Sequence, residues 1–264
     1  MKEVNIDYSI ISRGTEKYTN QGYMAISEII DSYRYIMNIN HNVKKGSLNN
    51  NCLKAKACYS IENIVFSRFQ LITALAFERF KNIINDNILI LGMGNLGISC
   101  LIYLLDNEFK SITIYVREKN NRILELLRLI KKEYRVNVTI ITDINLICEK
   151  KFNTFIDTTG DSFVLKDIFN YSIYNSLIII LSTPRDEKYL ISPLTINRKN
   201  LIVVGGHEIN GISKVNRQKS YEQLLYNNKN KDYLKKFVNV HSYSELNLRK
   251  IKNSKSNFID MFKY

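Results

Sequence analysis

Three glycines with the spacing Gly92-x-Gly94-x-x-Gly97 directly follow an apolar run, Ile88–Leu91. A buried strand, a tight glycine turn and a helix start form, in that order, a cradle for a dinucleotide pyrophosphate. Gly92 allows the turn, Gly94 lets the backbone approach the phosphates, and Gly97 lets the helix pack closely on the strand. The helix N-terminus offers N–H groups and a partial positive charge to the anion. The spacing predicts a nucleotide site; the alternative is an ordinary glycine turn in an α/β sheet.

Strands and helices alternate around this turn. The expected strands are Ile88–Leu91, Ser111–Val116, Val136–Ile141, Thr154–Asp157, Ser176–Leu181 and Leu201–Val204, and the expected helices are Leu96–Leu105, Asn121–Lys132 and Lys166–Tyr174. Short, nearly all-apolar strands separated by helices indicate a parallel sheet that is covered on both faces. We therefore expect an α/β fold with a doubly wound, Rossmann-type sheet.

The two flanks of this region have a different pattern. Alternating residues predict antiparallel strands at Asn5–Ile11 and Tyr23–Ile30, a loop over residues 38–51, and a helix at Ser67–Phe80 that leads into the sheet. From about Ser213 onward we expect a helix near Tyr221–Tyr226 and a short strand at Phe237–His241. The flanks are therefore mixed in structure rather than a continuation of the parallel sheet.

Composition argues against several classes of protein. The chain has 264 residues, a net charge of +13, and four cysteines and three histidines without zinc-ligand spacing. Cys100, on the apolar face of a helix, is expected to be a buried structural thiol.

Because the chain has neither a membrane-span pattern nor a signal-peptide pattern, we expect a cytoplasmic protein without a membrane partner. The basic residues are densest at Lys229–Lys236 and Arg249–Lys255, but no nucleic-acid motif accompanies them, so a specific nucleic-acid partner is not expected.

Several segments resemble motifs of the medium-chain dehydrogenase/reductase superfamily, which includes the zinc alcohol dehydrogenases. The matching segments, in the order and spacing of that superfamily, are Ile10–Glu16 (IISRGTE), Gly22–Ile30 (GYMAISEII), Thr73-Ala74, Asp157–Gly160 (DTTG) and Leu201–Gly206 (LIVVGG). The resemblance implies a Rossmann domain plus a mostly β, GroES-like catalytic domain that is built from both chain ends. It divides the chain into an N-terminal catalytic part (1–67), a cofactor domain (68–212) and a C-terminal catalytic part (213–264).

The resemblance fails at the metal ligands. Where zinc-dependent members carry a cysteine, a histidine and a glutamate, this chain has Arg13, Tyr23 and Met24. An arginine is always cationic and a thioether is a weak ligand, so these residues do not replace a thiolate or an imidazole. We expect no zinc, as in a zinc-lacking branch of reductases with bacteriochlorophyllide-dehydrogenase-like members.

The catalytic part is also short. Five residues, Lys17–Gln21, separate the Gly-Thr-Glu and Gly-Tyr motifs, where relatives have a much longer loop. A truncated lobe predicts an open substrate cleft, and an open cleft excludes water poorly. A degenerate descendant that binds a nucleotide without turnover is therefore a second hypothesis.

Cofactor preference is expected to depend on the end of the second strand. Arg117 takes the position at which a carboxylate usually binds the ribose 2′-hydroxyl, with Glu118 next to it. An arginine there favours the 2′-phosphate of NADP(H), while NAD(H) stays possible through Glu118. With the motif residues, the predicted cofactor contacts are Thr73, Gly92, Gly94, Asn95, Leu96, Gly97, Arg117, Thr158, Gly160 and Gly205.

The candidate catalytic residues come from the resemblance. Thr15 takes the hydroxyl position of the superfamily's proton relay, and Tyr23, in place of a zinc ligand, is able to donate a proton or polarise a carbonyl. Glu16 is expected to orient its neighbours or to pair with Arg13, and His207 to be a surface histidine. These residues suggest an NADPH-dependent reductase of a polarised C=C or C=O bond in a small-molecule substrate. Superfamily habit implies a homodimer through the edge of the sixth strand.

Overall fold

The computed structural model describes residues 2–12, 16, 24–84, 87–184, 192–208, 211–252 and 259–264. These residues form two compact units: residues 72–207, and residues 1–71 together with 208–264. The division falls inside helix α2 (Ile61–Phe80) and between His207 and Glu208, a few residues from the expected domain boundaries. None of the helices within the described ranges is both long and apolar enough to cross a bilayer.

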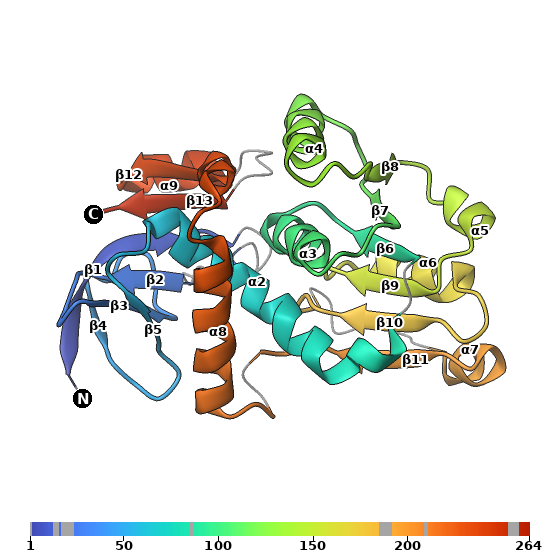
Figure 1. The fold of residues 1–264 in the computed structure, drawn as a ribbon, viewed down its shortest axis with the longest axis horizontal. Coiled ribbons are helices and arrows are strands. Elements are labelled where there is room, and N and C mark those ends of the chain that lie inside the picture. The colour runs from blue at the N-terminus through green and yellow to red at the C-terminus, as the bar shows by residue number, and fades with distance from the viewer. Residues whose placement is uncertain are drawn as a thin grey trace. The chain divides into compact units, whose positions relative to one another are not determined.

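The unit of residues 72–207 is a parallel sheet with helices (Figure 1). Its strands are β6 (Ile88–Leu91), β7 (Ile112–Tyr115), β8 (Thr139–Ile141), β9 (Thr154–Asp157), β10 (Leu177–Ile180) and β11 (Ile202–Gly205). Its further helices are α3 (Asn95–Asp106), α4 (Asn121–Tyr134), α5 (Leu146–Lys150), α6 (Ser162–Tyr171) and α7 (Pro193–Lys199), with a 3-10 turn, η1, at Lys81–Ile83. The strand order β11-β10-β9-β6-β7-β8 is that of a doubly wound sheet, and it confirms the predicted fold class.

The core of this unit lies on both faces of the sheet. Every residue of β6 and of β9 is buried, as expected for central strands with helices on each side. Helix α4 shows the opposite pattern, since Ile123, Leu126 and Ile130 are buried along one face of an otherwise exposed helix. Its first turn is capped by the Asn120 side chain, which accepts a hydrogen bond from the Ile123 N–H at 3.0 Å.

The other unit is built around a mixed sheet to which both chain ends contribute. Its strands are β1 (Glu3–Ile10), β2 (Met24–Ser27), β3 (Tyr33–Met37), β4 (Lys45–Ser47), β5 (Leu53–Lys56), β12 (Val238–Ser242) and β13 (Ile259–Lys263). They follow the order β12-β13-β1-β2-β3-β5, with β4 paired to β1. The pairing of β13 with β1 is antiparallel, whereas β12 and β13 are parallel. The C-terminal segment thus returns to the N-terminal sheet, as the predicted catalytic domain requires.

Helices α2 and α8 carry buried polar contacts in this unit. Helix α8 runs from Lys214 to Asn228, followed by η2 (Asp232–Phe237) and α9 (Glu245–Lys252). The Tyr221 hydroxyl donates to the Ile64 carbonyl at 2.9 Å, and the Asn228 amide donates to Ser67 Oγ at 2.8 Å. Both tyrosine and asparagine are fully buried, so these bonds satisfy groups that water does not reach.

Several element predictions were too short or incomplete. Helix α2 begins at Ile61 rather than Ser67, α6 begins at Ser162 rather than Lys166, and α8 extends well beyond Tyr221–Tyr226. The expected loop over residues 38–51 contains the short strand β4, while β3, β5, β13, α5, α7 and α9 were not predicted. A strand of three residues, such as β4, is too short to show a clear alternation of apolar and polar residues. Its stability comes from pairing with β1, which the local sequence does not reveal.

Candidate functional site

The glycine turn lies at the point where the order of the parallel sheet reverses. Strand β6 has β7 on one side and β9 on the other, and the turn Gly92–Gly97 follows its carboxyl end (Figure 1). In open doubly wound sheets, the crevice outside the strand ends at this switch point is where ligands bind. The predicted nucleotide turn therefore has the topological position that such a site needs.

Each glycine of the turn meets a different constraint. Gly92 has φ +97, a left-handed conformation that favours glycine. A Cβ on Gly97 would lie 2.3 Å from the Gly92 carbonyl oxygen, because helix α3 packs directly on the turn. A Cβ on Gly94 would meet no atom of the described residues within 4 Å. Gly94 is thus the glycine that faces open space.

The open space at Gly94 adjoins the start of helix α3. Gly94 is the N-cap residue, so it brings no side chain to cap the first helical turn of Asn95, Leu96 and Gly97. Backbone N–H groups at a helix N-terminus, together with the helix dipole, attract an anion. The arrangement fits the pyrophosphate of a dinucleotide.

A second turn, after β9, lies beside the glycine turn. The Asp157 carboxylate is buried and accepts bonds from the Thr159 N–H (2.8 Å), the Thr159 hydroxyl (2.6 Å) and the Ser182 hydroxyl (2.9 Å). Burial raises the pKa of Asp157, while these bonds act in the opposite direction. Gly160 completes the turn at φ +64, where a Cβ would lie 2.4 Å from the Thr183 carbonyl oxygen. Sequence reasoning did not assign Asp157 to the site, although a carboxylate at the end of an apolar strand is a usable signal.

Thr158 connects the two turns. Its N–H and its hydroxyl both donate to the Leu91 carbonyl, at 3.1 and 2.7 Å. Its Oγ1 would also lie 3.0 Å from a Cβ on Gly97. Thr158 therefore fixes the spacing between the ends of β6 and β9, and the predicted site residues Gly92, Gly97, Thr158 and Gly160 are close neighbours.

Arg117 follows β7 and reaches the residues that follow β9. Its Nη2 forms an ion pair with Asp161 Oδ2, and Asp161 is itself the N-cap of helix α6. The Arg117 side chain is 68% exposed, so water screens this pair and its contribution to stability is small. A phosphate is therefore able to exchange with Asp161 as the partner of Arg117.

Thr73 and Gly205, the predicted cofactor residues at the two ends of this unit, differ in their surroundings. Thr73 is fully buried in helix α2, and the Cys100 thiol of α3 is fully buried as well. Burial raises the pKa of Cys100 to about 12, as expected for an inert structural thiol. Gly205 borders open space, whereas a Cβ on Gly206 would lie 2.4 Å from Leu181 Cδ2. His207 is exposed.

The predicted catalytic residues Thr15 and Tyr23, together with Arg13, lie outside the described residues. Glu16, the last residue of the same motif, is described and buried. Its Oε1 accepts from the Ser12 N–H at 2.8 Å, and its own N–H donates to the Ser12 carbonyl at 2.9 Å. This reciprocal pair holds the two ends of the Ser12–Glu16 segment together.

Glu16 is also part of a buried polar cluster that sequence reasoning missed. Its Oε2 lies 2.7 Å from His41 Nε2 and 3.1 Å from Lys252 Nζ, and the Ser9 hydroxyl bonds to His41 Nδ1. Because a carboxylate only accepts, His41 Nε2 donates to Glu16, and a neutral His41 accepts from Ser9. Ser9 is 1% exposed, so its hydroxyl does not face a substrate. We therefore interpret this Ser9–His41–Glu16–Lys252 cluster as an anchor for the motif.

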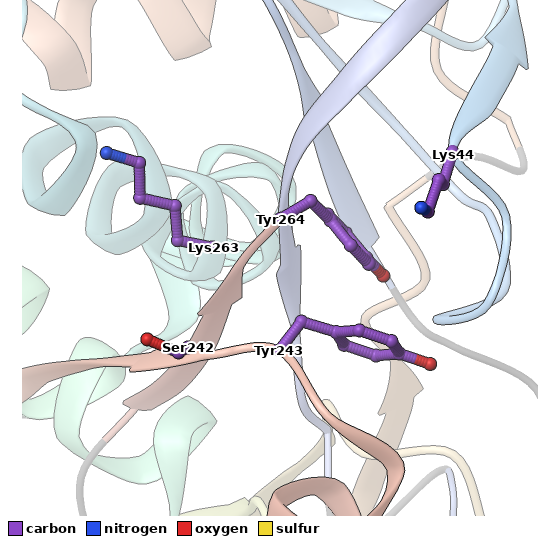
Figure 2. Close-up of a pocket in the computed structure, with 5 residues that line it drawn as sticks. All are labelled: Lys44, Ser242, Tyr243, Lys263 and Tyr264. Carbon is purple, nitrogen blue, oxygen red and sulfur yellow. The ribbon is translucent and has the colours of Figure 1, made fainter.

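A surface hollow adjoins this cluster through Tyr264. The hollow has a volume of about 370 Å³ and is lined by Lys44, Ser242, Tyr243, Lys263 and Tyr264. Figure 2 shows both tyrosine rings extending toward the side of Lys44, whereas Lys263 extends the opposite way. The Tyr264 hydroxyl donates to the His41 carbonyl. None of the predicted site residues that the structure describes lines this hollow.

The described residues offer no donor set for zinc. No three histidine, cysteine, aspartate or glutamate side chains within the described ranges lie where they could hold a metal ion. Met24, at a position that a zinc ligand's neighbour takes in the zinc-dependent relatives, is fully buried in β2. Neither a thioether nor an arginine supplies the ligand field that zinc requires.

Comparison with solved structures identifies the fold. The chain is similar to galactitol-1-phosphate dehydrogenase from Escherichia coli (TM-score 0.73, 14% identity, 99% of this chain and 92% of that one). It is also similar to S. aureus TarJ in complex with NADPH (0.72, 16%, 99% and 90%) and to the YhdH oxidoreductase from Salmonella enterica in complex with NADP (0.73, 12%, 99% and 90%).

Comparison by sequence finds no match, in contrast to comparison by structure. No protein-family model matches the chain, and no curated protein matches it. At identities of 11 to 16% the likeness lies in the fold rather than in side chains. The chain therefore has the Rossmann plus GroES-like fold of the medium-chain dehydrogenases and reductases, in agreement with the resemblance of its motifs.

Proposed function

We propose that the chain is an NAD(P)H-dependent oxidoreductase that reduces a polarised C=C or C=O bond of a biosynthetic intermediate without zinc. The observation that carries this proposal is the open, uncapped helix start at Gly94, placed at the switch point of a doubly wound sheet. The solved structures of similar fold in complex with NADPH or NADP support a nicotinamide cofactor.

Each part of the proposed site has a separate task. The N–H groups at the start of α3 would hold the pyrophosphate, and Arg117 would hold a 2′-phosphate, which favours NADP(H) over NAD(H). Asp157 and Thr158 position the two turns. A bound reduced nicotinamide supplies a hydride to an electrophilic carbon.

Proton handling is proposed for the motif that Glu16 anchors. Thr15 would bind and orient the substrate oxygen, and Tyr23 would donate the proton that completes reduction. Glu16 lies next to Thr15 in the chain and is held by Ser12, His41 and Lys252. A residue that orients the substrate needs a fixed position, so the contacts of Glu16 support the role proposed for its neighbour Thr15.

The decisive test of the nucleotide site is Gly94→Asp. An aspartate at an N-cap caps the helix amides and adds a negative charge where the pyrophosphate would bind. We expect NADPH binding, followed by fluorescence, to weaken at least a hundredfold while the melting temperature is unchanged or higher. Unchanged NADPH affinity in this variant would refute the proposed site.

Turnover separates the proposed enzyme from a nucleotide-binding regulatory protein. We expect NADPH oxidation with at least one member of a panel of enones and ketones, and its loss in Tyr23→Phe with NADPH binding retained. Tight NADPH binding without oxidation of any panel member would favour the regulatory alternative.

We also propose a homodimer through strand β11. This strand ends the order of the parallel sheet, and its Ile202 is 43% exposed. An apolar edge strand is a template for pairing with a second copy. Sedimentation equilibrium should give twice the 30.9 kDa mass of the chain, and a monomer mass at micromolar concentration would contradict the proposal.

A further inference from the structure

Two buried arginines interact electrostatically with one carboxylate, that of Glu208, in the unit that contains the mixed sheet. Arg68, from helix α2, forms a two-point ion pair with Glu208, and both side chains are almost completely buried. Arg217, from helix α8, is 3% exposed. Two guanidinium groups against one carboxylate leave one positive charge without a compensating negative charge among these groups.

The environment of Arg217 shows that this excess charge is costly. Burial lowers the pKa of Arg217, Glu208 raises it, and Arg68 lowers it again. Its Nε is buried and has no hydrogen-bond partner among the described residues. A buried cation with an unused donor is destabilising unless an acceptor is supplied.

A small cavity adjoins both arginines. It has a volume of about 80 Å³, with Arg68 and Arg217 in its wall, the buried strand end Ile36–Met37 beside them, and the exposed Asn38, Asn49 and Asn51 around it. Such a space is larger than a single water needs and has room for one small oxyanion. The cavity therefore has an interior of arginine and a polar rim.

The hydrogen-bonding groups of the cavity favour an acceptor as its occupant. Arginine offers donors only, in a planar fork that matches an oxyanion. The Asn49 side-chain oxygen already accepts from the Asn51 N–H at 2.8 Å, which leaves its NH₂ group as a donor. A cation would meet like charge here, and water would leave the excess charge in place.

We propose that this Arg68–Arg217 cavity binds a small oxyanion, a phosphate or a carboxylate, either free or as the end of a larger molecule. The oxyanion supplies the negative charge and the acceptor that Arg217 lacks. The cavity shares no residue with the glycine turn, so the proposal stands independently of the proposed cofactor.

Calorimetric titration and thermal unfolding of the whole chain test the proposal, with inorganic phosphate and acetate compared with chloride at constant ionic strength. We expect saturable binding of phosphate or acetate, with a rise in melting temperature beyond that in chloride. In Arg217→Gln this affinity should fall at least tenfold. Arg128→Gln, the same change at an exposed arginine of α4, should bind as the wild type does.

The melting temperatures of wild type and Arg217→Gln without phosphate or acetate give a second, independent test. If Arg217 belongs to an anion site, Arg217→Gln in dilute chloride should melt at or above the wild-type temperature, because an uncompensated charge is removed. If Arg217 is instead a structural residue, the variant should melt lower. A lower melting temperature, or a wild-type response to phosphate and acetate equal to that of Arg217→Gln, would overturn the proposal.

A phosphomonoester distinguishes the two sources of the anion. Phenyl phosphate that binds as well as inorganic phosphate supports a site for the end of a larger molecule. Binding of inorganic phosphate with exclusion of the ester supports a free ion. NADPH affinity should be the same in wild type and Arg217→Gln, so failure of this proposal is distinguishable from failure of the proposed function.

Discussion

The glycine turn of the parallel sheet and the Ser9–His41–Glu16–Lys252 cluster of the mixed sheet are stabilised in different ways. The turn depends on backbone conformation, and its three glycines lie within one short segment. The cluster depends on side-chain hydrogen bonds between residues from both ends of the chain. A site made of backbone is encoded locally, whereas a site made of side-chain contacts requires the folded sheet to bring its members together.

The two regions also differ in what they leave available to a ligand. At Gly94 the backbone borders open space beside the start of helix α3, and the N–H groups of a helix start attract an anion. In the cluster the carboxylate of Glu16 already has three partners, and its side chain is fully buried. The first region thus leaves room for a ligand beside a helix start, whereas in the second the carboxylate is satisfied within the protein.

The largest expected effect is that of Glu16→Ala. Removing the carboxylate leaves His41 and Lys252 without their partner and frees the Ser12 N–H, so unfolding should become easier by about 3–5 kcal/mol. Urea unfolding measures this change. Glu125→Ala, at an exposed glutamate of α4, should stay within about 0.5 kcal/mol of wild type. A similarly small loss for Glu16→Ala would show that the cluster does not anchor the motif.

Gly97→Ala should have the next largest effect. Its Cβ would lie 2.3 Å from the Gly92 carbonyl oxygen, so the helix and the turn must move apart at a cost of about 1–3 kcal/mol. Gly205→Ala is the matched control, since its Cβ meets no described atom within 4 Å. Equal urea midpoints for the two variants would mean that the turn tolerates a side chain at Gly97. The structural difference between the closely packed Gly97 and the open Gly94 would then have no effect on stability.

Arg117→Gln tests side-chain recognition beside the backbone turn. Loss of the guanidinium should weaken NADPH binding about tenfold, in the range of a charge-assisted hydrogen bond, with little change in NADH binding or stability. Calorimetric titration of both nucleotides measures the preference. Lys119→Gln removes a nearby exposed charge and should leave the preference unchanged. An equal loss for both nucleotides would assign Arg117 a general rather than a 2′-phosphate role.

The smallest expected effect is a pH dependence from Asp157. Because burial raises its pKa in the folded state, the folded protein binds the proton more tightly than the unfolded chain. Its contribution to stability is therefore fully present below the unfolded pKa and is lost as pH rises through the folded pKa. As pH falls from neutral toward the unfolded pKa, the free energy of unfolding of wild type should rise relative to that of Asp157→Asn in urea titrations. A constant difference would argue against a raised pKa.

The parallel sheet was predictable to a large extent because its signals are local. Strands β6 and β9 have the predicted bounds, Ile88–Leu91 and Thr154–Asp157, since a short apolar run between turn residues is sufficient to indicate a buried strand. The start of α6 was missed although Asp161 is its N-cap, because an aspartate directly before apolar residues is a helix-start signal that the prediction did not use. The mixed sheet was harder to predict, because β4 and β13 depend on pairing with β1.

The candidate site likewise has features that are encoded locally and features that depend on the folded structure. The turn at Gly92 and the close packing at Gly97 were predicted from spacing alone and are present, while phosphate contact at Gly94 stays a prediction. The hydrogen bonds of Asp157 and His41 could not be predicted in this way. Asp157 is bonded to Ser182 and His41 to Glu16, and these partners are distant in the chain. Arg117 was predicted as a phosphate ligand, and its pairing with Asp161 became visible only in the folded unit.

The sequence by itself determined the doubly wound sheet, the glycine turn and the resemblance to the medium-chain dehydrogenases, because these depend on short-range periodicity and backbone freedom. Only the tertiary structure decided which glycine faces open space, which carboxylates are buried, and that Arg68 and Arg217 lie beside one cavity with Glu208 as their common counter-charge. These features arise when helices and strands distant in sequence pack together, and the free energy of a buried charge depends on every group that surrounds it.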